Sequence, residues 1–72
     1  MRNIALMDIK RRILDLEQAA SLSGISHAEM LSQIGIHRAT WDRWKAGTTS
    51  PRLSAWVAIN DMLSRLLRKR AA

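Results

Sequence analysis

The sequence predicts an all-α fold of four to five short helices in a single domain that spans residues 1–72. Strand signals are nearly absent, because no run alternates between apolar and polar side chains with a period of two and Val57 is the only valine. Three glycines, at positions 24, 35 and 47, each follow a segment whose apolar residues recur at helical spacing. Glycine readily adopts the left-handed conformation that follows a helix, so these positions predict three helix ends.

The outer segments predict the two longer helices. The first helix is expected over about residues 4–22, where apolar side chains recur along one face. The last is expected over about residues 51–69, with Ser50 as its N-cap and Pro51 in the first helical position. Asn60 lies at the edge of the apolar stripe of this segment. It leaves two alternatives open, one continuous helix or a break into two.

The middle of the chain predicts two short helices joined by a tight turn. Ser26 begins the first, and Glu29 three residues later predicts a capping box, in which each side chain accepts a hydrogen bond from the other residue's backbone amide. This helix is expected to end near Ile34, and the second to run over about residues 38–46. With the glycine-centred turn at residues 35–37, the pair forms a helix-turn-helix unit.

The helix expected over residues 38–46 has two unlike faces. At about 100° per residue, Trp41 and Trp44 point in one direction, which favours core packing for them over base stacking. The opposite face carries Arg38, Ala39, Asp42, Arg43 and Ala46. A helix about 10 Å across fits a DNA major groove about 12 Å wide, where arginines reach guanine and alanine methyls meet thymine methyls. This face therefore predicts a reader of double-stranded DNA.

The positive charge is concentrated in one half of the chain. The whole chain has 12 basic and 6 acidic residues, a net charge of +6. Residues 1–36 carry four residues of each sign, whereas residues 37–72 carry eight basic and two acidic residues. Such asymmetry indicates a polyanionic partner. The basic residues near the C-terminus, Arg65, Arg68, Lys69 and Arg70, also fit a solvated helix end that complements the helix dipole.

One stretch resembles a known family of regulators. Residues 26–63, SHAEMLSQIGIHRATWDRWKAGTTSPRLSAWVAINDML, are similar to the helix-turn-helix domain of phage Cro/repressor-type (XRE-like) proteins. The matching positions are Gly35-Ile36, Arg38, Thr40, Trp41, Arg43-Trp44 and Gly47 through Pro51. The resemblance implies a lambda-repressor-like fold and a transcriptional regulator, usually a homodimer on a palindromic operator. It also implies a phosphate contact at the position of His27.

Specific roles follow from this interpretation. The bases are expected to be read by Arg38, Ala39, Asp42 and Arg43. The DNA backbone is expected to be contacted by His27, His37, Thr40, Lys45, Thr48, Thr49 and Arg52. Asp42 opposes phosphate binding, so its two alternative roles are base selectivity and a surface pair with Arg38, four residues away.

A dimer interface is expected on the last helix. Its apolar stripe offers more surface than a domain of this size is expected to bury in its core. The residues expected in the interface are Ile59, Leu63, Leu66 and Leu67. A single recognition helix reads only a few base pairs, and a symmetric pair reading half-sites about 34 Å apart solves this.

Other classes of function are disfavoured. The chain has no cysteine, no glycine-rich phosphate loop and no metal-ligand cluster, so neither an enzyme nor a metal or cofactor site is expected. No segment reads as a membrane span or signal peptide, which predicts a cytoplasmic protein that is nucleoid-associated when bound. A chain this short leaves little room for a pocket, so no small-molecule effector is expected.

Two alternatives remain open. The first is an antitoxin-like protein that binds its own promoter and also a protein partner, which would use the helix containing Leu66 and Leu67. The second is a basic amphipathic peptide on a membrane surface. The orderly caps and the turn glycines favour a globular domain over such a peptide.

Overall fold

Four α-helices make up the part of the chain that the computed structural model describes, residues 6–71, with side chains placed from residue 9 to residue 69. They are α1 (Leu6–Leu22), α2 (His27–Ile34), α3 (Arg38–Ala46) and α4 (Leu53–Ala71), and the described residues include no strand. The predicted all-α class is confirmed. The expected start of the first helix, at residue 4, lies outside the described residues.

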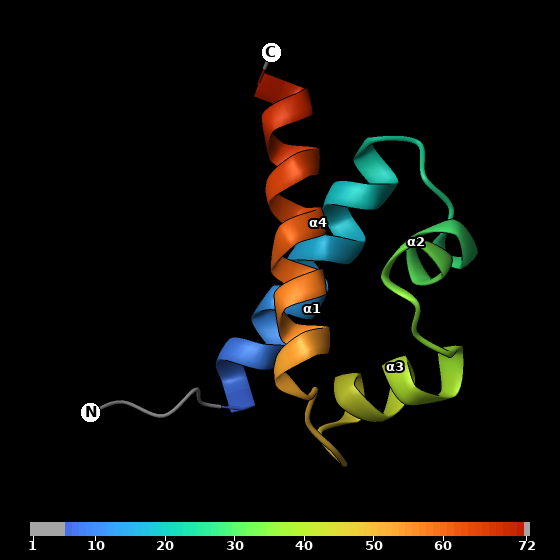
Figure 1. Ribbon diagram of the computed structural model, residues 1–72, viewed down its shortest axis with the longest axis vertical. Coiled ribbons are helices and arrows are strands. Elements are labelled where there is room, and N and C mark those ends of the chain that lie inside the picture. The colour runs from blue at the N-terminus through green and yellow to red at the C-terminus, as the bar shows by residue number, and fades with distance from the viewer. Residues whose placement is uncertain (1–5, 72) are drawn as a thin grey trace.

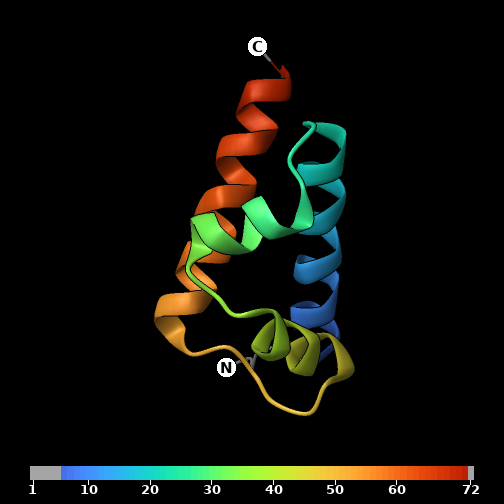
Figure 2. The ribbon, with the colours of Figure 1, turned by 90° about the vertical axis from the view of Figure 1, so that its right-hand side faces the viewer.

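The two long helices form a layer that supports the two short ones. α1 and α4 lie side by side and run in roughly the same direction, and α2 and α3 lie on one side of this pair (Figures 1 and 2). α1 packs against each of the other three helices, and α2 also packs against α4. The layer formed by α1 and α4 thus supports the helix-turn-helix of α2 and α3 on one side.

The core forms where the apolar faces of all four helices meet. Its fully buried large side chains are Ile13, Leu16, Met30, Trp41, Ile59 and Met62. Trp41 and Trp44 are both buried, as the helical spacing predicts, and their rings lie 6.0 Å apart in a tilted arrangement. Trp56, by contrast, is only half-buried at the edge of the core.

The three turns that follow helices use one backbone motif. Gly24, Gly35 and Gly47 all have positive φ angles, 76°, 71° and 82°. In the turn after α2, the amide of Ile36 donates to the carbonyl of Leu31 over 3.0 Å, which is the long bond of a Schellman motif. The equivalent bonds occur after α1 and α3. The predicted ends of these helices at glycine are therefore confirmed.

The cap of α2 is simpler than the predicted capping box. The Ser26 hydroxyl accepts a hydrogen bond from the amide of Glu29 over 3.1 Å, as expected. The Glu29 carboxylate, however, accepts from the side chain of Gln33, four residues along the same helix, over 3.0 Å. The Gln33 side chain, which is accessible on the same helix, thus competes with the Ser26 amide as the donor to the Glu29 carboxylate.

The start of α4 differs from the sequence prediction. The amide of Trp56 donates to the carbonyl of Arg52 over 2.8 Å, so Arg52 precedes the helix and Ser50 does not cap it. α4 then continues without a break through Asn60. The Asn60 amide donates to the carbonyl of Trp56 over 2.8 Å, which satisfies this polar side chain within the helix and removes the reason for a break.

The apolar stripe of α4 is almost entirely used inside the protomer, so the expected excess of apolar surface on it is wrong. Ile59, Leu63 and Leu66 are buried, with exposed fractions of 0%, 5% and 6%. The reason is that both α1 and α2 pack against this helix and cover the stripe. Of the four residues expected in a dimer interface, only Leu67 is exposed, at 52%.

Trp44→Ala should unfold much of the population, because losing a buried tryptophan typically costs about 3–5 kcal/mol and small domains have little stability to spare. Urea denaturation followed by circular dichroism measures the change. Leu53→Ala is the control, since Leu53 is 77% exposed and its loss should change stability by less than about 0.5 kcal/mol. Equal stabilities for the two variants would contradict the role of Trp44 in the core.

Candidate nucleic-acid interface

The outer face of α3 is formed by the residues opposite its buried tryptophans. Arg38, Ala39, Asp42 and Arg43 are all exposed. α3 begins after His37, whose extended backbone (φ −73°, ψ 148°) turns the chain sharply out of the preceding loop, and the His37 side chain makes no capping hydrogen bond. The burial of Trp41 and Trp44 therefore fixes which way this face points.

The charged groups on this face are only weakly engaged with one another. Arg38 Nε lies 3.9 Å from Asp42 Oδ2, and the two side chains are 79% and 59% exposed. A surface pair of this kind contributes only a few tenths of a kcal/mol, so both groups stay available to a ligand. Arg43 makes no ion pair with any side chain that the structure places.

Both ends of α3 are flanked by exposed polar residues. His37 lies before the helix, and Thr48 and Thr49 follow its terminal glycine. Arg52 is exposed just before α4 and forms no ion pair among the described side chains. Thr40 is different, because it is half-buried. Four of the residues expected to contact the DNA backbone are thus exposed and form no ion pair among the described side chains: His37, Thr48, Thr49 and Arg52.

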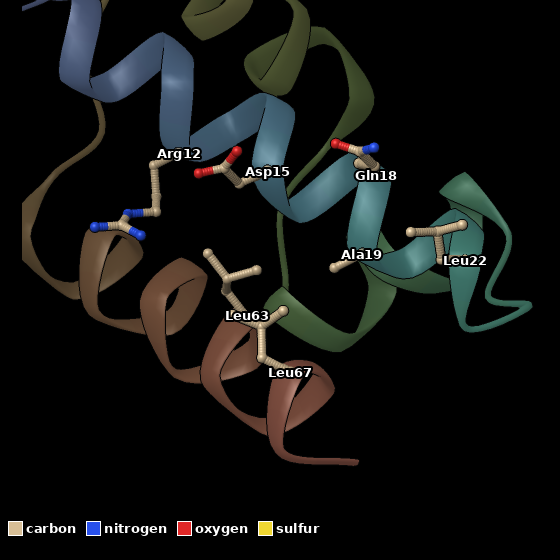
Figure 3. Close-up of a pocket in the computed structure, with 7 residues that line it drawn as sticks. All are labelled: Arg12, Asp15, Gln18, Ala19, Leu22, Leu63 and Leu67. Carbon is tan, nitrogen blue, oxygen red and sulfur yellow. The ribbon is translucent and has the colours of Figure 1, made fainter. Parts of the chain in front are cut away.

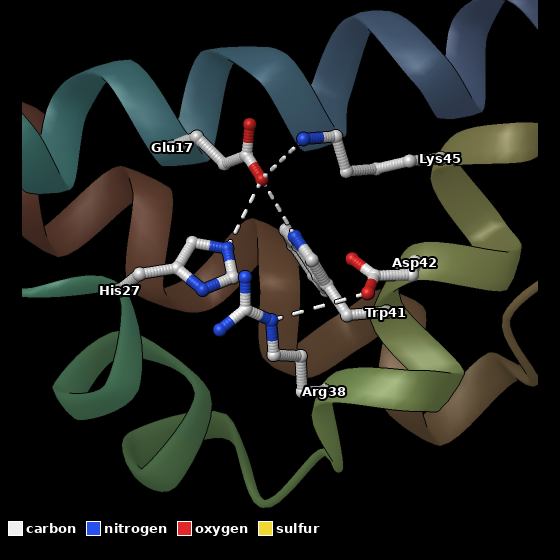
Figure 4. A network of polar contacts seen from close by, with 6 residues as sticks. All are labelled: Glu17, His27, Arg38, Trp41, Asp42 and Lys45. Carbon is white, nitrogen blue, oxygen red and sulfur yellow. Dashed lines mark hydrogen bonds and ion pairs between the residues drawn. The ribbon is translucent and has the colours of Figure 1, made fainter.

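A single carboxylate oxygen joins three helices behind this surface. Glu17 Oε2, on α1, accepts a hydrogen bond from Trp41 Nε1 over 2.7 Å and lies 3.1 Å from Lys45 Nζ. His27 Nε2, at the start of α2, donates to the same oxygen over 3.2 Å (Figure 4). His27 and Lys45, both expected to contact DNA phosphates, are therefore directed at Glu17.

The position of Glu17 was not anticipated from the sequence, although two signals point to it. It follows Ile13 by four residues, which places it beside the buried face of α1. A fully buried tryptophan also requires an acceptor for its indole N–H, and Trp41 has none within its own short helix. The sequence does not indicate which acceptor on another helix lies within reach.

The surroundings of Glu17 favour its ionised form. Burial by itself raises the pKa of the carboxyl, but the hydrogen bonds from its three partners and the positive charge of Lys45 outweigh burial. The net effect is a pKa below the ordinary value. Glu17 is therefore a carboxylate at neutral pH, and the network links an anion to Lys45.

Neither a cluster of metal-ligating side chains nor a membrane-spanning helix occurs in the described part of the chain. Among the side chains that the structure places, no three of histidine, aspartate or glutamate come together as metal ligands. None of the helices within residues 6–71 combines the length and the apolar character that a membrane span requires.

The free energy of unfolding should depend on pH through Glu17. Because its pKa is lowered in the folded state, its stabilising contribution is complete above the unfolded pKa of about 4.3 and is lost as the pH falls through the lower folded value. Urea denaturation at a series of pH values should show the stability difference between wild type and Glu17→Gln shrinking in that window. Glu29→Gln, on the exposed side of α2, is the control, and a difference for Glu17→Gln that stays constant with pH would contradict the network.

Comparisons of the chain with protein-family models, with curated proteins and with solved structures found no match. What the α2–α3 unit does has to be inferred from its own geometry and charge.

Proposed function

We propose that the protein is a sequence-specific regulator of transcription that binds double-stranded DNA with α3 in the major groove. The observation that carries this proposal is the exposed face of α3, where two arginines and an aspartate surround a small alanine. The opposite face is anchored in the core by Trp41 and Trp44. A rigidly mounted, exposed helix of this kind meets the requirements for reading base edges.

The chemistry of the face suits direct recognition of bases. Arg43 has no ion pair to give up among the described side chains, so its guanidinium is available for bidentate binding to guanine. Ala39 offers a methyl group and lets the helix backbone approach the bases closely. Asp42 lies between the arginines, and its negative charge repels a phosphate or a hydrogen-bond acceptor. DNA sites that would place such a group opposite Asp42 are therefore disfavoured.

The polar residues at both ends of α3 suit contact with the DNA backbone. His37 lies at one end, and Thr48, Thr49 and Arg52 lie at the other. Contacts on both sides of a recognition helix hold it in register along the groove, while the bases supply the sequence information. Residues 37–52 carry four basic residues and one acidic residue, a net charge of +3, and a positive charge of this kind attracts the phosphate backbone.

Selection of bound sites from random duplex DNA tests the proposal directly. A regulator of this kind should enrich a single short motif in two inverted copies, at a spacing of about one helical turn. If no motif is enriched over repeated rounds, the protein is not a sequence-specific DNA-binding regulator.

Arg43→Ala should relax the sequence preference and weaken binding to the selected site by about 1–3 kcal/mol, as expected for an arginine that reads a base. Titrations on the selected site and on random duplex measure both effects. Arg52→Ala is the matched control, because a phosphate contact contributes to all sequences about equally. Equal losses on both DNAs for Arg43→Ala would contradict its assignment to a base.

A homodimer is the assembly that we propose for this regulator. The surface that fits a second copy is a groove between α1 and α4, where Leu22 and Leu67 are both more than half exposed (Figure 3). Arg12 and Asp15 line the same groove, and neither forms an ion pair with another side chain that the structure places. In a two-fold arrangement, the arginine of each protomer can meet the aspartate of its partner.

Leu67→Glu should therefore give a folded monomer, because the side chain is half exposed within the protomer and lines the groove. Sedimentation at micromolar concentration, with and without the selected DNA, measures the change in mass. Leu53→Glu, at the other end of α4, is the control and should leave assembly unchanged. A wild-type protein that sediments as a monomer both free and on DNA would overturn the dimer.

A further inference from the structure

We propose that Glu17 is an internal counterion that withholds Lys45 from external polyanions. Lys45 then adds nothing to the sequence-independent attraction between the protein and nucleic acid. The inference rests on the proposed function for the identification of the polyanion as DNA. Its geometric basis is the contact between Lys45 Nζ and Glu17 Oε2, at 3.1 Å.

The carboxylate is held in place before it meets the lysine. Trp41 is fully buried, and its indole donates the shortest bond of the network, 2.7 Å, to Glu17 Oε2. The Glu17 side chain is only 19% exposed, so it is shielded from water far more than an ordinary surface carboxylate. Lys45 thus pairs with a fixed anion and does not need to order a mobile one, which removes much of the entropic cost that makes surface ion pairs weak.

The lysine is nevertheless close to the surface that would meet a polyanion. Its side chain is 41% exposed, and it belongs to the last turn of α3, next to the exposed Thr48 and Thr49. A groove between α1, α2 and α3 exposes Glu17 together with Lys45, and it is also lined by His27, Arg38 and Asp42. A phosphate that attracted Lys45 from this side would leave the Glu17 carboxylate beside it, and like charges repel.

The consequence is a bias toward selective binding. A lysine that contacts phosphate strengthens binding to every duplex equally, because the DNA backbone is the same in all of them. Cancelling its charge inside the protein lowers affinity for random DNA while the base-reading face of α3 is left intact. Arg52, which has no carboxylate partner among the described side chains, is the contrasting case of a cation left available.

Two variants that each remove one negative charge test the inference. Glu17→Gln keeps an oxygen for the Trp41 indole but frees Lys45, whereas Glu29→Gln removes an exposed carboxylate of α2 that takes no part in the network drawn in Figure 4. On random duplex DNA, one additional phosphate contact steepens the slope of log affinity against log salt by about 0.9. We expect this steepening for Glu17→Gln and a smaller change, or none, for Glu29→Gln.

Substituting Lys45 in both the wild-type and the Glu17→Gln backgrounds completes a double-mutant cycle. Lys45→Gln in the wild-type background should leave the salt slope unchanged, because the charge that it removes is already neutralised. In the Glu17→Gln background, the same substitution should return the slope to the wild-type value. Arg52→Gln should lower the slope by about 0.9 in either background. If Lys45→Gln lowers the wild-type slope as much as Arg52→Gln does, the inference is overturned.

Elution from a heparin column separates a failure of this inference from a failure of the proposed function, since heparin is a polyanion without base sequence. Glu17→Gln should elute at higher salt than Glu29→Gln, although the two carry the same net charge, and equal elution overturns the inference whatever the DNA selection shows. Circular dichroism establishes that each variant is folded. If Glu17→Gln does not fold, the salt slopes of Lys45→Gln and Arg52→Gln decide the outcome. Equal reductions of the slope overturn the inference, and a reduction confined to Arg52→Gln supports it.

Discussion

The hydrogen bond from the Trp41 indole to Glu17 is the contact on which the arrangement of the short helices depends. Trp41 is fully buried, and a buried N–H without an acceptor costs about 1–3 kcal/mol. The acceptor comes from α1, so satisfying this one group fixes α3 against the long helix behind it. Because His27 donates to the same oxygen, the start of α2 is placed by the same atom. One carboxylate thus connects the supporting helix to both parts of the helix-turn-helix.

Stability and proposed recognition use opposite sides of α3. Its two tryptophans fill the core, which leaves Arg38, Asp42 and Arg43 directed outward with few partners of their own. A nine-residue helix has little intrinsic stability in water, so its order comes from this packing. The proposed reading face is therefore rigid because the face behind it is buried, and recognition does not require the exposed residues to stabilise the helix.

The long helix α4 shows how a small domain obtains enough core. Ile59, Leu63 and Leu66 are covered by α1 and α2, and this burial uses nearly the whole apolar stripe within one protomer. What remains for association is a narrower surface around Leu67, Leu22 and the charged edge of α1. Any contact between two copies along this groove is consequently smaller and more polar than the full stripe would have provided.

The sequence by itself determined the features that depend on neighbours a few residues away. The helix ends at Gly24, Gly35 and Gly47 were predictable, because each rests on a backbone conformation that glycine adopts at little cost and on hydrogen bonds within one turn. The inward direction of Trp41 and Trp44 was predictable as well, since helical periodicity alone separates the two faces of α3. The exposed face with Arg38, Ala39, Asp42 and Arg43 follows from the same periodicity.

Only the tertiary structure decided which distant groups meet. Glu17 and Trp41 are 24 residues apart, and no local pattern indicates that one will accept the hydrogen bond of the other. The same limit applies to the stripe of α4, whose burial depends on how closely α1 and α2 pack over it, and to Lys45, whose partner lies on another helix. Periodicity gives the direction of a side chain from its own helix axis, whereas its partner is set by the packing of helices against one another.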